Sequence, residues 1–158
     1  MRLRLVLVAG LLAAVVLPAA ALGRSSSTKT FVTKLTGGVE VPKGAPAGSG
    51  QASITITGTK VCWAFTKIKG ITKPLVSHIH KGGPGKAGPV VVPLGGAFKL
   101  KGCTTTTAAI AKAIVAKPGA YYVNIHTPKF PAGAIRGQLG KAGKSTASKG
   151  GGGYGAGY

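Results

Sequence analysis

All three histidines of the chain lie in two short segments of similar design. His78 and His80 belong to the sequence SHIH at 77–80, and His126 ends the sequence YYVNIH at 121–126. Each segment runs into a turn rich in Gly and Pro and then into an apolar stretch. Three histidine ligands with one open coordination position are a known arrangement for zinc and copper. The three histidines are therefore a candidate site for Cu or Zn.

The spacing of these residues fits β-strands, in which alternate side chains share a face. His78 and His80 would lie on one face of the first strand, and Asn124 and His126 on one face of the second. The residues between them are β-branched and apolar, so we expect those to face the core. If the two strands are neighbours, the three imidazoles converge. The alternative is a structural role, in which the imidazoles bond to loop carbonyls and hold the Gly/Pro turns.

The first 23 residues have the organisation of a secretory signal peptide. A short basic start with Arg2 and Arg4 precedes an apolar run from Leu5 to Ala21, which is followed by small residues. No later stretch is long and apolar enough to cross a membrane. We therefore expect an exported protein, secreted or held in the cell envelope, with a short flexible leader over 24–30.

Export gives meaning to the two cysteines, because disulfides persist in oxidising compartments. Cys62 and Cys103 are an even pair, and we predict that they form a disulfide. A bond closing a loop of about 40 residues would add roughly 2–4 kcal/mol of stability. Two buried free thiols or a metal-bound thiolate pair are the less favoured alternatives.

The charge balance is extreme, with 21 Lys and Arg against a single acid, Glu40, and no Asp. Glycoside hydrolysis by paired carboxylates needs two acids, and calcium or two-metal sites need several. We therefore predict a protein without enzymatic activity. The positive charge favours an anionic cell-surface polymer or protein as partner. Specific nucleic-acid binding is not expected, since the lysines are scattered and few aromatic residues accompany them.

Between the leader and a Gly/Ser/Lys-rich tail at 140–158, which we expect to be disordered, lies one domain over 31–139. Short alternating segments separated by Gly/Pro turns predict an antiparallel β-sandwich. The expected strands cover 31–35, 51–57, 60–68, 76–80, 90–94, 97–101, 120–126 and 134–139. One short helix is expected over 107–116, where Ile110 and Ile114 have helical spacing and Pro118-Gly119 follows.

Several motifs in this region resemble the CHRD domain, which is repeated in chordin and occurs singly in secreted bacterial proteins. In chain order the matching motifs are GVEVP at 38–42, HIHKG at 78–82, GPVV at 88–91, YYVNIHT at 121–127, FPAG at 130–133 and IRGQL at 135–139. The resemblance implies an immunoglobulin-like all-β sandwich and a non-enzymatic binding or structural module. Ala134 departs from the family pattern, which often has Glu at this position.

A weaker resemblance connects the His-x-His strand, the Gly-rich loop and the later histidine to copper–zinc superoxide dismutase. The fourth histidine and the bridging Asp of that enzyme have no counterpart here, so a dismutase is not predicted. Arg136 is the only arginine of the predicted domain. Because its planar guanidinium binds carboxylates or carbonyls in a fixed geometry, we predict an ion pair with Glu40 or, alternatively, a bond to loop carbonyls near the histidines.

Two functions from different classes follow from the sequence. The first is an exported CHRD-type binding or structural module that contacts anionic polymers. The second is a metal-binding protein that uses His78, His80 and His126. Nucleic-acid binding is a third, without a motif to support it, and would show a steep dependence on salt.

Overall fold

The computed structural model describes residues 27–140 of the chain. The predicted signal peptide at 1–23 lies outside these residues, as do nearly all of the predicted tail and the first part of the predicted leader. The described part holds eight strands, one α-helix and two 3₁₀ turns. Their bounds are β1 Thr28–Thr36, η1 Gly37–Val39, β2 Ser49–Thr57, β3 Lys60–Lys69, β4 Val76–Lys81, β5 Val90–Pro93, β6 Lys101–Thr105, α1 Ala108–Ala116, η2 Pro118–Ala120, β7 Tyr121–His126 and β8 Ile135–Gln138.

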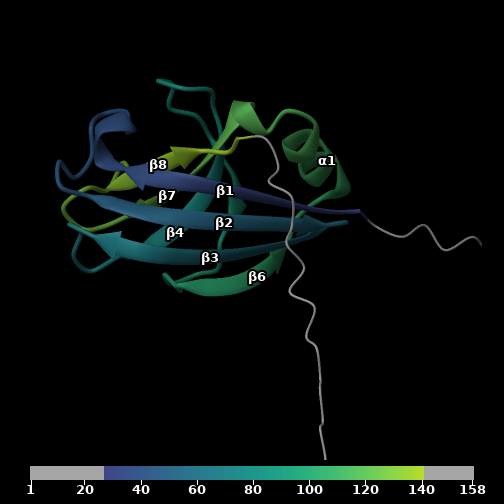
Figure 1. Cartoon of the computed structure of the whole chain (residues 1–158), viewed down its shortest axis with the longest axis horizontal. Helices are drawn as coiled ribbons and strands as arrows, with labels where there is room; N and C mark the ends of the chain where they lie inside the picture. Colours follow the sequence, from purple (N-terminus) through teal and green to yellow (C-terminus); the bar gives the residue numbers. More distant parts are fainter. Residues whose placement is uncertain (1–26, 141–158) are drawn as a thin grey trace, which may run out of the picture.

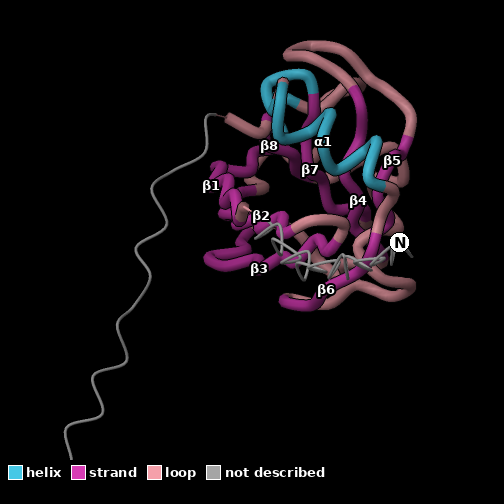
Figure 2. The backbone as a smooth tube through the Cα atoms, turned by 90° about the vertical axis from the view of Figure 1, so that its right-hand side faces the viewer, coloured by secondary structure: helices cyan, strands magenta, loops and turns pink. Residues whose placement is uncertain are grey.

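The eight strands form one antiparallel sheet in the order β5-β4-β7-β8-β1-β2-β3-β6. Long strands β1, β2 and β3 make one side of the molecule, while β4 and β7 lie behind them (Figure 1). Viewed along the strands, the sheet curls around its interior (Figure 2). The predicted antiparallel all-β fold with one short helix is confirmed, and the two layers of the predicted sandwich are joined into a single, nearly closed sheet.

The core follows from the alternation of β2 and β3. Ile54 and Ile56 of β2 are buried, as are Val61, Trp63 and Phe65 of β3, because these positions point to the concave side of the sheet. Burial of a side chain of this kind stabilises the fold by about 1.5–3 kcal/mol. The other large core residues are Phe31, Leu35, Ile79, Val92, Leu94, Ile114, Tyr121, Val123, Ile125, Ile135 and Leu139.

The predicted disulfide is confirmed. Cys62 in β3 and Cys103 in β6 are direct partners in the register of the two strands, and their sulfur atoms are bonded. The strand predicted over 97–101 was placed too early, since β6 covers 101–105. The register explains the difference, because Cys103 lies opposite Cys62. The segment before β6 instead places the ring of Phe98 against that of Phe65.

The first strand begins at Thr28, three residues before the predicted start, so the predicted leader reaches too far. Thr28 and Thr30 pair with Thr57 and Thr55 of β2, and the hydroxyl groups of each pair are hydrogen-bonded. A strand with a partner along its whole length satisfies its backbone groups, which extends the sheet into a polar segment.

The predicted helix is confirmed as α1, which lies at the end of the sheet where β1 begins (Figure 1). The Thr107 hydroxyl accepts a hydrogen bond from the Ile110 amide and caps its first turn. Ala111 and Ile114 turn inward and join the core. No helix of the described residues has the length and apolar character needed to cross a membrane.

Candidate metal centre

The three histidines come from β4 and β7, which are neighbours in the sheet. His78 lies opposite Asn124 and His80 lies opposite Tyr122, so that His126 is diagonal to His78. All of these side chains share the face that points away from the apolar core. On the other face Ile79, as well as Val123 and Ile125 of β7, is completely buried. The alternation of both strands therefore brings the three imidazoles together, as the sequence pattern predicts.

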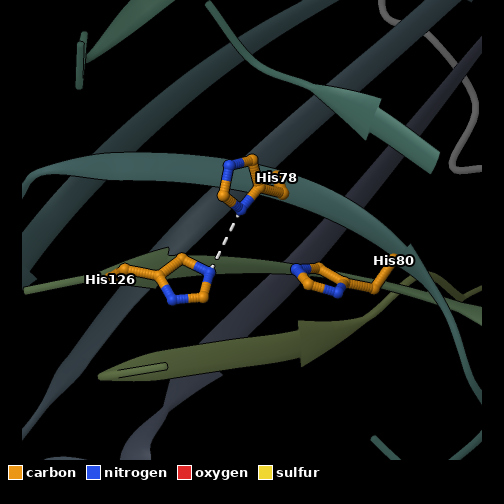
Figure 3. Close-up of side chains that lie close together, drawn as sticks. All are labelled: His78, His80 and His126. Carbon is orange, nitrogen blue, oxygen red and sulfur yellow. Dashed lines mark hydrogen bonds between the residues drawn. The ribbon is translucent and has the colours of Figure 1, made fainter. Parts of the chain in front are cut away.

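The three rings are turned toward one another (Figure 3). One nitrogen from each histidine can be chosen so that all three lie within 4.8 Å of one another. The Nδ1 atom of His78 is 3.1 Å from Nε2 of His126, the hydrogen bond drawn as a dashed line. The ring of His80 faces this pair from the other side of the cluster, with its centre 5.6 Å from that of His78 and 5.9 Å from that of His126.

Backbone carbonyls determine which nitrogen of two of these rings carries a proton. Nδ1 of His80 is 2.9 Å from the Gly88 carbonyl oxygen, and Nδ1 of His126 is 2.9 Å from that of Pro131. A carbonyl only accepts, so both Nδ1 atoms donate. In the neutral rings Nε2 then carries the lone pair, and in His126 this atom lies 3.1 Å from Nδ1 of His78 and 3.1 Å from the side-chain amide of Asn124. This is the arrangement in which metal-binding histidines are oriented by hydrogen bonds from their other nitrogen.

The site favours the neutral form of His78 and His80. Burial, followed by the nearby rings of His126 and His80, lowers the pKa of His78 to about 4. Burial also lowers the pKa of His80, against the opposing effect of the Gly88 carbonyl. Nε2 of His80 is buried and has no hydrogen-bond partner in the described part of the chain. A buried lone pair without a donor is costly unless another group fills the position.

Loops cover the outer face of β4, β7 and β8, so the face is a second, polar interior. The loop after β4 contributes Gly88, and the loop after β7 contributes Pro131. Gly88 has to be glycine, since a Cβ atom there would collide with the Lys81 carbonyl. His80 is 7% exposed and Asn124 is completely buried, although both belong to the face that the sequence pattern places outside.

Sequence reasoning missed Tyr122 as part of this layer. Its ring is stacked on His80, with ring centres 4.8 Å apart and planes inclined by 6°. The guanidinium carbon of Arg136 lies 4.2 Å from the centre of the same ring, which gives a cation–π contact. The signal was present, because Tyr122 has the same strand parity as Asn124 and His126.

Gln138 was also missed as a site residue, although it shares the parity of Arg136 in β8. Its side-chain Nε2 lies within hydrogen-bond distance of the carbonyl oxygens of Gly82, Gly119 and Tyr121. Gly119 precedes β7 and Tyr121 is its first residue, while Gly82 begins the loop that carries Gly88. Gln138 therefore ties this loop to the sheet.

Of the two predicted partners of Arg136, the structure records the loop carbonyl. The Nη1 atom donates to the Lys86 carbonyl at 3.0 Å, and the side chain is 2% exposed. Glu40 lies close enough for the charge of Arg136 to act on its carboxyl. A direct ion pair between Glu40 and Arg136 stays a prediction.

Glu40 is buried, with 4% of its surface exposed, and its carboxyl packs against Gly133. A Cβ atom at Gly133 would collide with both carboxylate oxygens, and the φ angle of +143° also favours glycine there. Burial raises the pKa of Glu40 to about 7, against the lowering effects of Arg136 and of the Asn124 amide. Oε1 of Glu40 and Nδ2 of Asn124 have no hydrogen-bond partner of good geometry among residues 27–140.

A family profile described as the CHRD domain matches residues 31–139, which is most of the chain. The chain therefore belongs to the CHRD family, and the resemblance seen in its motifs is confirmed. No curated protein and no solved structure shows a significant match to the chain. Membership in this family of non-catalytic domains supports a binding or structural module.

Proposed function

We propose that this CHRD domain is an exported binding module that holds one Zn²⁺ or Cu²⁺ ion at His78, His80 and His126. The observation that carries the proposal is the convergence of three imidazole nitrogens within 4.8 Å on one face of the sheet, where His80 is buried and the other two rings are half-buried. The ligand atoms would be Nδ1 of His78 and Nε2 of the other two histidines. Export of the protein rests on the signal-peptide pattern of residues 1–23.

The size of the cluster suits such an ion. Zinc binds imidazole nitrogen at about 2.0–2.1 Å, so tetrahedral ligands lie roughly 3.3 Å from one another. The separation of 3.1 Å between His78 and His126 is close to this value, and His80 would need only a small side-chain movement. When the proton of His78 moves from Nδ1 to Nε2, a third lone pair faces the centre. Copper would bind more tightly than zinc at such a nitrogen site.

The structural role of the histidines makes a different prediction from the metal site. Hydrogen bonds to Gly88 and Pro131 account for the Nδ1 atoms of His80 and His126, but they leave Nε2 of His80 without a partner. A purely structural histidine would not require that atom to face two other imidazoles. The metal site accounts for both nitrogens of the ring.

The test is metal uptake by the full chain, produced without a histidine tag and first treated with a chelator. We expect one equivalent of Zn²⁺ by elemental analysis and calorimetry, and a rise in melting temperature because the ion binds only the folded state. His78→Ala/His126→Ala should lose both effects, while Lys129→Ala, an exposed change near the same loops, should keep them. No uptake by the wild-type protein, or equal uptake by the histidine variant, would overturn the proposal.

A second proposed function is contact with anionic polymers outside the cell. It is supported by 21 basic residues against one acid, and by lysines such as Lys34, Lys43 and Lys86 that are exposed. Binding of polygalacturonate to the metal-free protein should be strong at low salt and weaken steeply between 50 and 500 mM NaCl, because the Debye length falls from about 10 Å at 0.1 M to about 3 Å at 1 M ionic strength and exposed charges are then screened. Absence of binding at low salt would contradict this function.

A further inference from the structure

A groove lies beside the polar layer and includes Arg136 in its lining. It has a volume of about 500 Å³ and runs between the turn at 38–43 and the loop that contains Pro84 and Gly85. Its remaining lining comes from the end of β1 and from β8, including Lys34 and Gln138. Pockets of roughly 300–1,000 Å³ are typical of small-ligand sites. The groove is therefore large enough for one or two sugar rings.

Arg136 places a buried positive charge at this groove, and few hydrogen bonds and little negative charge compensate it. It is 2% exposed, and within the described residues its recorded hydrogen bond is the one from Nη1 to the Lys86 carbonyl. A guanidinium has five N–H donors, so most are left for another acceptor. The chain has one acid, Glu40, whose carboxyl packs against Gly133 and retains its proton in part near neutral pH. A buried cation without a full counter-charge is costly unless an anion approaches it.

Besides Glu40 and the polar side chains of Thr36 and Gln138, the rest of the lining combines basic and apolar groups. Lys34 and Lys43 are exposed, and both line the groove. Val39 and Val41 are 53% and 38% exposed and lie in the same lining, together with Pro84. Large apolar side chains left open beside lysines are a feature of binding surfaces, because water contact with them is unfavourable. Carbon-bound hydrogens on one face of a sugar ring can cover such a surface.

We propose that this groove binds an acidic saccharide, with an anionic group of the sugar at Arg136 and the ring over Val39 and Val41. This inference rests on the proposed contact with anionic polymers, and it is independent of the metal centre. The planar fork of arginine matches a carboxylate or a sulfate. Among the described residues that line the groove none is aromatic, so the base stacking that single-stranded nucleic acids use has no platform here.

The experiment is calorimetric titration of the full chain with trigalacturonate, in the presence of EDTA so that the metal centre has no part. Lys34→Gln/Lys43→Gln removes two charges at the groove, and Lys60→Gln/Lys101→Gln removes two exposed charges at the far strands β3 and β6. We expect the groove variant to bind at least about tenfold more weakly than the wild type, and the matched variant to stay within about twofold. Neutral galactotriose should not bind.

Sulfated and carboxylated trisaccharides serve as separate arms, because each carries an anionic group whose oxygens can accept hydrogen bonds from the guanidinium. Tighter binding of either than of oligothymidylate supports a saccharide groove. Equal loss in both lysine variants, or equal affinity for oligothymidylate, would overturn the groove. If long polygalacturonate is still bound while the trimer is not, the groove fails but polymer contact stands. If neither is bound, both proposals fail.

Discussion

The two faces of β4 and β7 enclose interiors of opposite character. One face carries Ile79, Val123 and Ile125 into an apolar core, where the hydroxyl of Ser77 is the one buried polar atom without a partner among the described residues. The other carries the histidines and Asn124 into a layer buried by loops. Of the four buried polar atoms without a partner in the described chain, three belong to that layer, on Glu40, His80 and Asn124. One face is thus arranged for stability, while the other retains unsatisfied groups that a ligand could use.

The largest effect is expected from the apolar face. Ile79→Ala should lower the free energy of unfolding by about 2–5 kcal/mol, because it leaves a cavity in a fully buried position. The neighbouring change His78→Ala, on the other face of the same strand, should cost less than half as much in metal-free protein. Urea denaturation of both variants with EDTA present gives the comparison. A larger loss for His78→Ala would mean that the polar layer is a stabilising core and not a site.

Removal of the disulfide should lower the stability of the fold without affecting the metal centre. Cys62→Ser/Cys103→Ser releases β6 from β3 and should lower the unfolding free energy by about 2–4 kcal/mol, for a sequence separation of 41 residues. Zinc uptake should remain at one equivalent at a temperature where the variant is folded, because the bond joins β3 to β6, which are not neighbours of β4 or β7 in the sheet. Loss of zinc uptake in a variant with a folded circular dichroism spectrum would contradict the independence of the two regions.

Glu40 gives a pH-dependent test of the polar layer. Its carboxyl has a pKa of about 7 in the folded protein against the ordinary value of 4.5, so the folded state holds the proton more tightly. Its contribution to stability is complete below pH 4.5 and is lost as the pH rises through about 7. Glu40→Gln lacks this loss and should be more stable than the wild type by up to about 3 kcal/mol at pH 8.5, with little difference at pH 4.5.

Thermal melts of both proteins across this pH range measure the difference directly, and effects of the histidines cancel because both proteins share them. The opposite sign at pH 8.5, with Glu40→Gln less stable, would show that the attraction of Arg136 outweighs burial. In that case the ion pair predicted from the sequence dominates this part of the layer.

The smallest effect is expected at Tyr122. Its hydroxyl accepts a hydrogen bond from the Gly88 amide at 3.3 Å, and Gly88 in turn accepts from His80. Tyr122→Phe keeps the ring stacked on His80 and should cost about 0.5–1.5 kcal/mol. Its zinc affinity should fall only slightly, as measured by competition with a chromophoric chelator. A loss of zinc affinity above about tenfold would show that the loop containing Gly88 contributes to binding in addition to the three imidazoles.

The sequence alone determined the secondary structure that alternation and turn residues control. The clean alternation of β2, the capped helix and the parity of His78, His80 and His126 are local properties, because side-chain direction in a strand has a period of two. The disulfide followed from the cysteine count, and the family from motifs spread over most of the domain. The start of β1 and the position of β6 could not be predicted, since both depend on the partner strand.

Tertiary structure decided what surrounds the histidines. Parity placed them opposite the core, but only the packing of the loops after β4 and β7 buries that face and supplies the carbonyls of Gly88 and Pro131. The stack of His80, Tyr122 and Arg136 joins three strands, and no local pattern encodes it. Burial of Glu40 against Gly133 likewise depends on residues 93 positions apart meeting in space. Desolvation and hydrogen bonding are set by these long-range neighbours, and they give the site its chemistry.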